Sequence, residues 1–187
     1  MEETIESMLK KGKDAFEKAK VHLNDELIKI RAGKASPSML SGIVVDYYGS
    51  PTPLNQVANV SSPDSKTLSI QPWEKSLLGP IEQAIFAANI GLTPMNDGEF
   101  VRITIPPLTE ERRRNLVKQA KNLVEEGKIS LRNTRHKLIE FIRKEVKDGY
   151  PEDAGKKREG EVDKMVKEAG DAMDELFVAK EKDIMTV

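Results

Sequence analysis

The sequence predicts an α+β protein in which a long antiparallel three-helix bundle carries an inserted β/α/β domain. Nine of the ten prolines and six of the twelve glycines fall within residues 31–107, so long helices are predicted only at the two ends. Both ends place apolar residues at helical spacing, whereas the middle holds short β-branched runs between Pro and Gly. We therefore assign residues 1–30 and 106–187 to the bundle and residues 31–105 to the insert.

The first helix is predicted within residues 1–30, which contain no proline. Its apolar and small residues recur at steps of three and four, which places them on one helical face. These residues are Ile5, Leu9, Gly12, Phe16, Ala19, Leu23, Leu27 and Ile30.

The middle of the chain predicts four strands and one helix. The strands are expected at residues 43–48, 56–60, 67–71 and 99–105. The helix is expected within residues 73–89, with an apolar side formed by Leu77, Ile81, Ile85 and Ala88. Only two chain crossings join this insert to the bundle, and both contain Pro or Gly. They predict a hinge made of Gly33, Ala35, Ser36, Pro37, Ile105, Pro106 and Pro107.

Two further helices are predicted after Pro107. Thr109 is the expected N-cap of the first, Glu110 and Glu111 suit its first turn, and residues 148–151 form the stop. Three narrow apolar faces that cannot remain in water predict a bundle. The apolar face of the first of these two helices contains Leu116, Ala120, Leu123, Gly127, Leu131, Thr134, Leu138 and Phe141. That of the final helix contains Val162, Met165, Ala169, Met173, Leu176 and Ile184.

The composition excludes several kinds of chemistry. The 187 residues include no Cys and only two His, and neither His22 nor His136 has the neighbours expected of a metal ligand. No Gly-rich phosphate loop precedes a Lys-Ser/Thr pair, and no apolar run approaches the roughly 20 residues of a membrane span. We expect a soluble cytoplasmic protein with no catalytic residues, cofactor, metal or small-molecule substrate. Trp73 is expected in the core of the insert.

The formal net charge of −1 conceals two oppositely charged segments. Residues 102–147 contain 13 basic and 6 acidic side chains, whereas residues 148–187 contain 7 and 12. One long helix is therefore strongly basic and the next is acidic, so the near-zero sum does not exclude a nucleic-acid partner.

Basic residues of the long helix also follow one face. They step by three and four, with Glu125 as the only acid in the series. One interpretation is a solvated face paired with acids of the final helix; the other is a phosphate-binding face. Arg132 and Arg135 lack an acid four residues away on their own helix, which favours the second interpretation. The series is Arg114, Lys118, Lys121, Lys128, Arg132 and Arg135.

Four motifs, in order, resemble the bacterial ribosome recycling factor family over essentially the whole chain. The first two are Arg31-Ala32-Gly33-Lys34-Ala35-Ser36-Pro37 and Tyr47-Tyr48-Gly49-Ser50-Pro51-Thr52-Pro53-Leu54-Asn55-Gln56. The third is Ile103-Thr104-Ile105-Pro106-Pro107-Leu108-Thr109-Glu110-Glu111-Arg112-Arg113, and the fourth is Arg132-Asn133-Thr134-Arg135.

The resemblance implies an L-shaped monomer that binds the post-termination ribosome. Elongation factor G, using GTP, would then separate the subunits, with release of mRNA and tRNA. By position, Arg31, Arg132 and Arg135 match family arginines that hold large-subunit ribosomal RNA. The chain departs from the common pattern at His136, where many members have another Arg, which puts the strength of this local contact in question.

Two other functions fit parts of the sequence. A coiled-coil protein-binding module, such as a chaperone cofactor, would also have long charged helices. An enzyme housed in the insert is disfavoured, because no nucleophile–base pair or metal-ligand set is visible.

Overall fold

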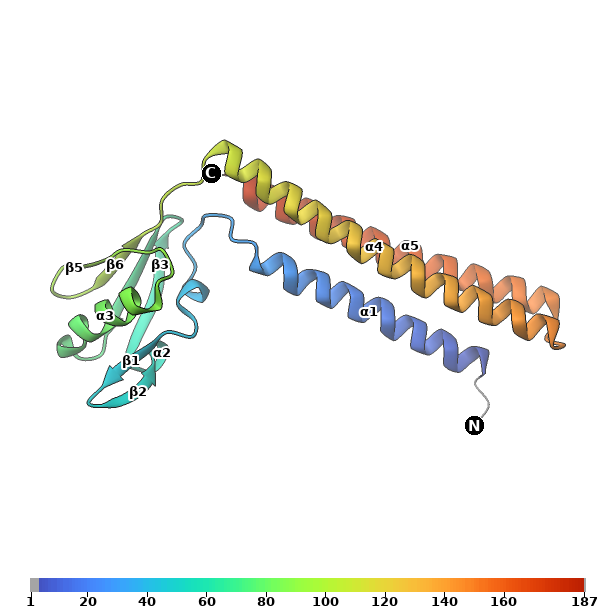
Figure 1. Cartoon of the computed structure of the whole chain (residues 1–187), viewed down its shortest axis with the longest axis horizontal. Coiled ribbons are helices and arrows are strands. Elements are labelled where there is room, and N and C mark those ends of the chain that lie inside the picture. Colours follow the sequence, from blue (N-terminus) through green and yellow to red (C-terminus); the bar gives the residue numbers. More distant parts are fainter. Residues whose placement is uncertain (1–3, 187) are drawn as a thin grey trace. The chain divides into compact units, whose positions relative to one another are not determined.

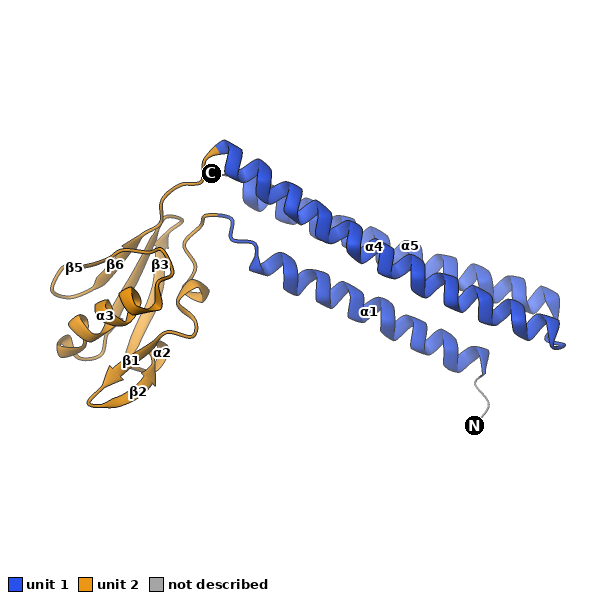
Figure 2. Ribbon diagram, in the orientation of Figure 1, with its two compact units in different colours: residues 1–32, 110–187 blue, residues 33–109 orange. Residues whose placement is uncertain are grey.

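A computed structural model describes residues 4–186 of the chain. It divides into two compact units, shown in different colours in Figure 2. One contains the described residues up to Ala32 and those from Glu110 onward, and the other contains Gly33–Thr109. The fold is α+β, as predicted: the first unit is helical and the second contains the sheets.

Helix α1 spans Ile5–Lys29 and begins with a capping box. The Thr4 hydroxyl accepts a hydrogen bond from the Ser7 backbone N–H, and the Ser7 hydroxyl accepts one from the backbone N–H of Thr4. Its predicted apolar face is confirmed, since Ile5, Gly12, Phe16, Leu23 and Leu27 are buried.

Helices α4 (Glu110–Lys147) and α5 (Glu152–Met185) form a long antiparallel pair, visible in Figure 1. Helix α4 packs against both α1 and α5, and α1 also contacts α5. The turn between α4 and α5 is made possible by Gly149, whose φ of +112° is a left-handed conformation that favours glycine.

The buried surface of α4 is broader than the predicted stripe. Val124 is 4% exposed while the expected Leu123 is half-buried, and Ile139 and Ile142 are also buried. A helix that packs on two neighbours must bury two faces, so a single stripe of period 3.6 underestimates its core surface.

The insert contains two antiparallel sheets. Strands β1 (Val44–Tyr47) and β2 (Ser50–Pro53) form a hairpin. Four further strands pair in the order β3-β4-β6-β5. They are β3 (Ala58–Asp64), β4 (Thr67–Pro72), β5 (Pro94–Asn96) and β6 (Val101–Thr104).

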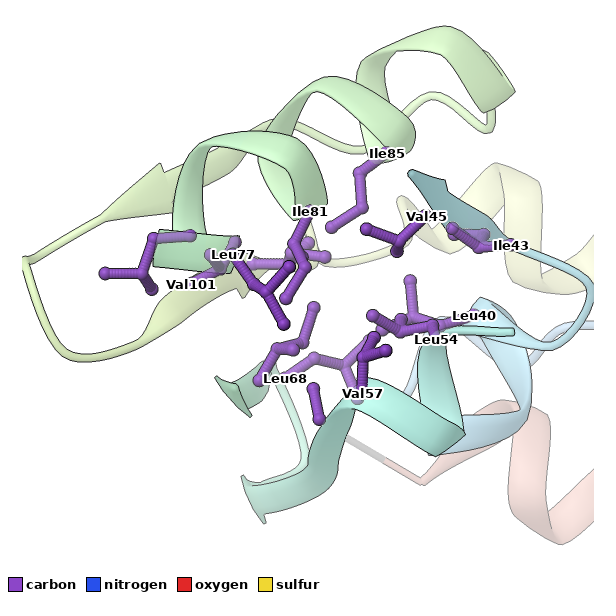
Figure 3. Close-up of a cluster of buried hydrophobic side chains, with 14 of the residues drawn as sticks. Leu40, Ile43, Val45, Leu54, Val57, Leu68, Leu77, Ile81, Ile85 and Val101 are labelled. Atoms are coloured by element: carbon purple, nitrogen blue, oxygen red, sulfur yellow. The ribbon is translucent and has the colours of Figure 1, made fainter. Parts of the chain in front are cut away.

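Short helices complete the insert and cover its core. Helix α3 spans Leu78–Ala88 and follows the 3₁₀ turn η2 (Lys75–Leu77). Helix α2 is one turn (Leu54–Val57), and η1 is a 3₁₀ turn (Pro37–Leu40). The core between these elements is aliphatic, as Figure 3 shows, and includes the fully buried Val45, Leu68, Ile70, Ile81, Ile85, Val101 and Ile103.

Several sequence expectations for the insert are wrong in detail. The strand expected from Gln56 begins at Ala58, because Leu54–Val57 forms a helical turn. Strands β2 and β5 were not predicted, since Pro and Gly obscure their pattern. Ala88 is exposed, and so is Trp73, at 67%. Strand β4 ends at Pro72 and aliphatic side chains fill the core, which leaves the Trp73 ring outside.

Candidate RNA-binding face of the bundle

The predicted basic series lies along α4, which presents it over most of the bundle's length. Arg114, Lys118, Lys121, Arg132 and Arg135 are exposed. Lys128 is half-buried, with 32% of its side chain accessible. Their spacing of three and four residues keeps them on neighbouring ridges of the helix. A row of cations about one helical turn apart can follow a phosphate backbone.

Two members of the series pair with acids of α5. Lys128 Nζ lies 2.6 Å from Asp174 Oδ1, and Arg135 Nε donates a 2.7 Å hydrogen bond to Asp163 Oδ1. The expectation that Arg135 has no acidic partner on its own helix holds, but the acidic neighbouring helix supplies one. The opposite charges of α4 and α5 are thus partly matched across their interface.

These pairs leave the cations able to bind an anion. The Arg135 and Asp163 side chains are 45% and 54% exposed, so water and salt screen their attraction. The contact engages only Nε of Arg135, and a guanidinium has five N–H donors in total. The four N–H groups on the outer nitrogens remain available for phosphate oxygens.

Four of the seven candidate residues form no ion pair with any residue between 4 and 186. They are Arg31, Lys118, Lys121 and Arg132. Arg114 pairs with Glu110 on its own helix. Arg132 is therefore the candidate arginine of α4 that is exposed and forms no ion pair within the described chain. Arg31 is exposed immediately after Ile30, the C-cap residue of α1.

A second group of cations, which the series missed, follows at the far end of α4. Lys137, Lys144 and Lys147 line an open groove with Met8 and Phe141, and Arg143 borders it. Arg143 Nε donates a 2.9 Å hydrogen bond to Glu159, which raises the pKa of the guanidinium. The excess positive charge of residues 102–147 was a signal for this group, but its members are out of phase with the series that ends at Arg135.

His136 lies beside the arginines and contributes charge only when protonated. Its Nε2 is 3.5 Å from Glu140 Oε1, one turn further along α4, so the expectation that His136 has no carboxylate neighbour at this spacing is wrong. Within residues 4–186, no cluster of three or more His, Cys, Asp or Glu side chains could hold a metal ion. In the same part of the chain, no helix is long and apolar enough to cross a membrane.

The predicted hinge residues occupy two linker segments with different surroundings. Gly33 has a φ of +72° and packs against Leu108. Ala35 and Ile105 are hydrogen-bonded to the β3–β4 turn, and Ile105 is buried. Ser36 caps the 3₁₀ turn that begins at Pro37, whereas Pro106 and Pro107 are exposed.

Together, these features define a class of α+β binding proteins. A three-helix bundle presents cations along one helix, and a second unit is inserted between its first two helices. Comparisons with known proteins give the particular family. Residues 23–185 match the family model described as "Ribosome recycling factor". The chain belongs to the ribosome recycling factor family.

Relatives and solved structures match over nearly the whole chain. A ribosome-recycling factor of Porphyromonas gingivalis is 50% identical over 184 residues, covering 98% of this chain and 99% of the relative. That of Flavobacterium psychrophilum is also 50% identical and covers both chains fully. A solution structure of ribosome recycling factor matches with a TM-score of 0.75 and 34% identity, over 100% of both chains.

One of the matching solved structures is that of a ribosomal complex. It contains models of T. thermophilus ribosome recycling factor and E. coli elongation factor G bound to the E. coli post-termination complex. This chain matches one of its chains with a TM-score of 0.62 and 36% identity, covering 98% of this chain and 100% of that one.

Proposed function

We propose that this protein binds the post-termination ribosome and, with elongation factor G and GTP, separates it into subunits with release of mRNA and tRNA. The observation that carries this proposal is the full-length match to relatives named for ribosome recycling. The match to a factor bound with elongation factor G to the post-termination complex supports the choice of partners. The coiled-coil alternative is not favoured, because the family match covers the insert as well as the helices.

We propose that the cationic face of α4 and Arg31 hold large-subunit ribosomal RNA. The face comprises Arg114, Lys118, Lys121, Lys128, Arg132 and Arg135. Arginine suits this role, since its planar guanidinium can give two parallel hydrogen bonds to a phosphate group. The unpaired Arg132 and the partly occupied Arg135 form the centre of the contact.

The two compact units act, in this proposal, as separate domains. The linkers that contain Gly33, Ala35, Ser36 and Pro37 on one side and Ile105, Pro106 and Pro107 on the other form the hinge. The insert can then change its orientation while the bundle stays on RNA. The protein works in the cytoplasm as a monomer and without catalytic residues of its own, because elongation factor G supplies GTP hydrolysis.

A two-part assay tests this function. Purified protein is mixed with vacant ribosomes in low salt, and binding is measured by pelleting. Subunit separation is then followed by light scattering with elongation factor G, with and without GTP. We expect binding without either addition and rapid separation only with both. A folded protein that does not bind the large subunit in low salt would contradict the proposal.

A further inference from the structure

A single turn of the insert holds both linkers. The backbone N–H of Ala35 donates a 2.8 Å hydrogen bond to the carbonyl of Ser65, and that of Ile105 donates a 2.7 Å bond to the carbonyl of Lys66. The two acceptors are consecutive residues of the turn between β3 and β4. The chain therefore enters and leaves the sheet at neighbouring points, although 70 positions separate Ala35 and Ile105 in the sequence.

The shape of this turn depends on two side chains. Asp64 Oδ1 accepts a 2.7 Å hydrogen bond from the backbone N–H of Lys66, and this bond is the largest cause of the lowered pKa of Asp64. The Ser62 hydroxyl lies 2.7 Å from the carbonyl oxygen of Asp64 and 3.3 Å from that of Ala35. Since a hydroxyl has one hydrogen, Ser62 donates it to the nearer carbonyl, that of Asp64. The carbonyl of Ala35 lies next to the same hydroxyl. The β3–β4 register shifts between Ser61 and Asp64, which makes room for this arrangement.

Sheet pairing ends abruptly where the chain leaves strand β6 and enters the outgoing linker. Strand β4 pairs with β6 up to Thr67 and Thr104, and the Ile105–Lys66 bond adds one more step. Pro106 and Pro107 have no backbone N–H, so the ladder cannot continue. On the incoming side, Ser36 caps η1 and Leu40 anchors that turn in the core.

Between these fixed points and the bundle, the linkers pack on each other. Gly33 adopts a φ of +72°, and a Cβ added there would lie 2.5 Å from Leu108 Cγ. Only glycine combines this backbone conformation with so close a contact. Gly33 and Leu108 therefore mark the place where the two linkers are in contact.

We propose that the β3–β4 turn, Ser62–Thr67, is a clamp that fixes the insert's end of both linkers. Ser62 and Asp64 are positioning residues for recycling. Within the proposed hinge, Ala35, Ser36, Pro37 and Ile105 form the fixed end, and bending is confined to residues 31–34 and 106–109. This inference rests on the proposed function, in which the insert moves relative to a bundle held on RNA. When both linkers are hydrogen-bonded to one turn, a force applied to the insert is transmitted to the bundle. When the turn is loosened, movement of the linkers absorbs much of that force.

The test compares the double variant Ser62→Ala/Asp64→Ala with Asp97→Ala. Asp97 is a matched control, because its Oδ1 also accepts backbone hydrogen bonds within a turn of the insert, from Glu99 (3.0 Å) and Phe100 (2.7 Å). That turn joins β5 to β6 and, among the described residues, forms no hydrogen bond to Ala35 or Ile105. Because the sequence has no Cys, Ala87→Cys on α3 and Asn122→Cys on α4 provide two unique labelling sites.

Spin labels at these sites report the distance between the two units. We expect the clamp variant to broaden the distance distribution and to slow subunit separation roughly fivefold, since each of the two lost hydrogen bonds makes only a modest net contribution. The dissociation constant for ribosomes should not change. Asp97→Ala should match the parent in all three measurements, and Asp64→Asn, which keeps the acceptor oxygen, should restore most of the rate.

An unchanged distance distribution in the clamp variant would overturn the inference, and so would an equal broadening in Asp97→Ala. If the double variant does not fold, Ser62→Ala alone is compared with Asp97→Ala by the same criteria. If the parent protein neither binds nor separates ribosomes, the proposed function fails. The distance measurement on free protein still decides whether the clamp exists.

Discussion

At the scale of single residues, Arg132 and Arg135 belong to one sequence motif but differ in their ion-pair partners. Arg132 forms no ion pair with the described residues, whereas Arg135 is held by Asp163 from the next helix. An unpaired guanidinium loses water but no partner when it binds RNA, while Arg135 must share its donors or exchange them. Arg132 should therefore contribute more to ribosome binding than its neighbour.

Replacing Arg132 with Ala should weaken ribosome binding by about 1–3 kcal/mol, the range for hydrogen bonds to a charged group. It should also reduce the slope of log affinity against log salt by about one, because one phosphate contact is lost. Pelleting across a salt series measures both quantities. Replacing Arg114 or Lys118 should cost less. Lys157→Ala, on the exposed surface of α5, is a control that should leave the affinity unchanged, and an unaltered constant for folded Arg132→Ala would count against the face.

Neutralising Asp163 should have the opposite effect. Asp163→Asn removes the charge that competes with RNA phosphate for Arg135, so ribosome affinity should rise severalfold. The free energy of unfolding should fall by less than about 1 kcal/mol, because the pair is half-exposed. Pelleting and urea denaturation check the two parts. A loss of affinity would show that the pair holds Arg135 in its binding position.

At the scale of elements, α4 has several tasks along its 38 residues. It buries one face against α1, a second against α5, and leaves cations on the remainder. Close approach to α1 depends on Gly12, because an added Cβ there would overlap the buried side chain of Leu138. A Cβ added at Gly160 on α5 would have no atom within 4 Å.

Gly12→Ala and Gly160→Ala should thus change stability in opposite directions. In both helices alanine gains about 0.5–1 kcal/mol of intrinsic helix preference. At Gly12 this gain is outweighed by overpacking, which typically costs about 1–3 kcal/mol. Thermal denaturation should show a lower melting temperature for Gly12→Ala and a slightly higher one for Gly160→Ala. Equal shifts in both would contradict the α1–α4 contact.

A feature can be predicted from the sequence when the residues that determine it are close together along the chain. The face of α1 and the arginines of α4 follow from local spacing, so periodicity finds them. The partner of Arg135 is Asp163, 28 positions away on another helix, and no spacing rule reaches it. The prediction for Trp73 was wrong, and strand β5 was not predicted, for a related reason. Their burial and pairing depend on which distant segments fill the insert's core, and local propensity does not contain that information.

At the scale of the whole molecule, the bundle and the insert have separate cores. The insert's core runs from Leu40 to Ile105 and lies within one uninterrupted stretch of chain. The bundle's core combines α1 with two helices from the other end of the sequence. Each unit thus has the buried apolar surface that a domain needs in order to fold.

The two units should unfold in separate transitions. Calorimetry should show two peaks, and Gly12→Ala should lower only the one that belongs to the bundle. Asp97→Ala, in the insert, should shift only the other. A single peak that moves as a whole in both variants would show that the units unfold cooperatively, against their treatment as separate domains.

The contact of Gly12 with Leu138 also bears on how the chain is made. Synthesis proceeds from the N-terminus, so α1 emerges long before the residue that covers it, and the whole insert is translated in between. The insert can complete its core at once, whereas the apolar face of α1 stays uncovered until most of the chain has left the exit tunnel. The bundle is therefore the late-folding part of the nascent chain, and α1 is the segment that most needs protection from aggregation while it waits.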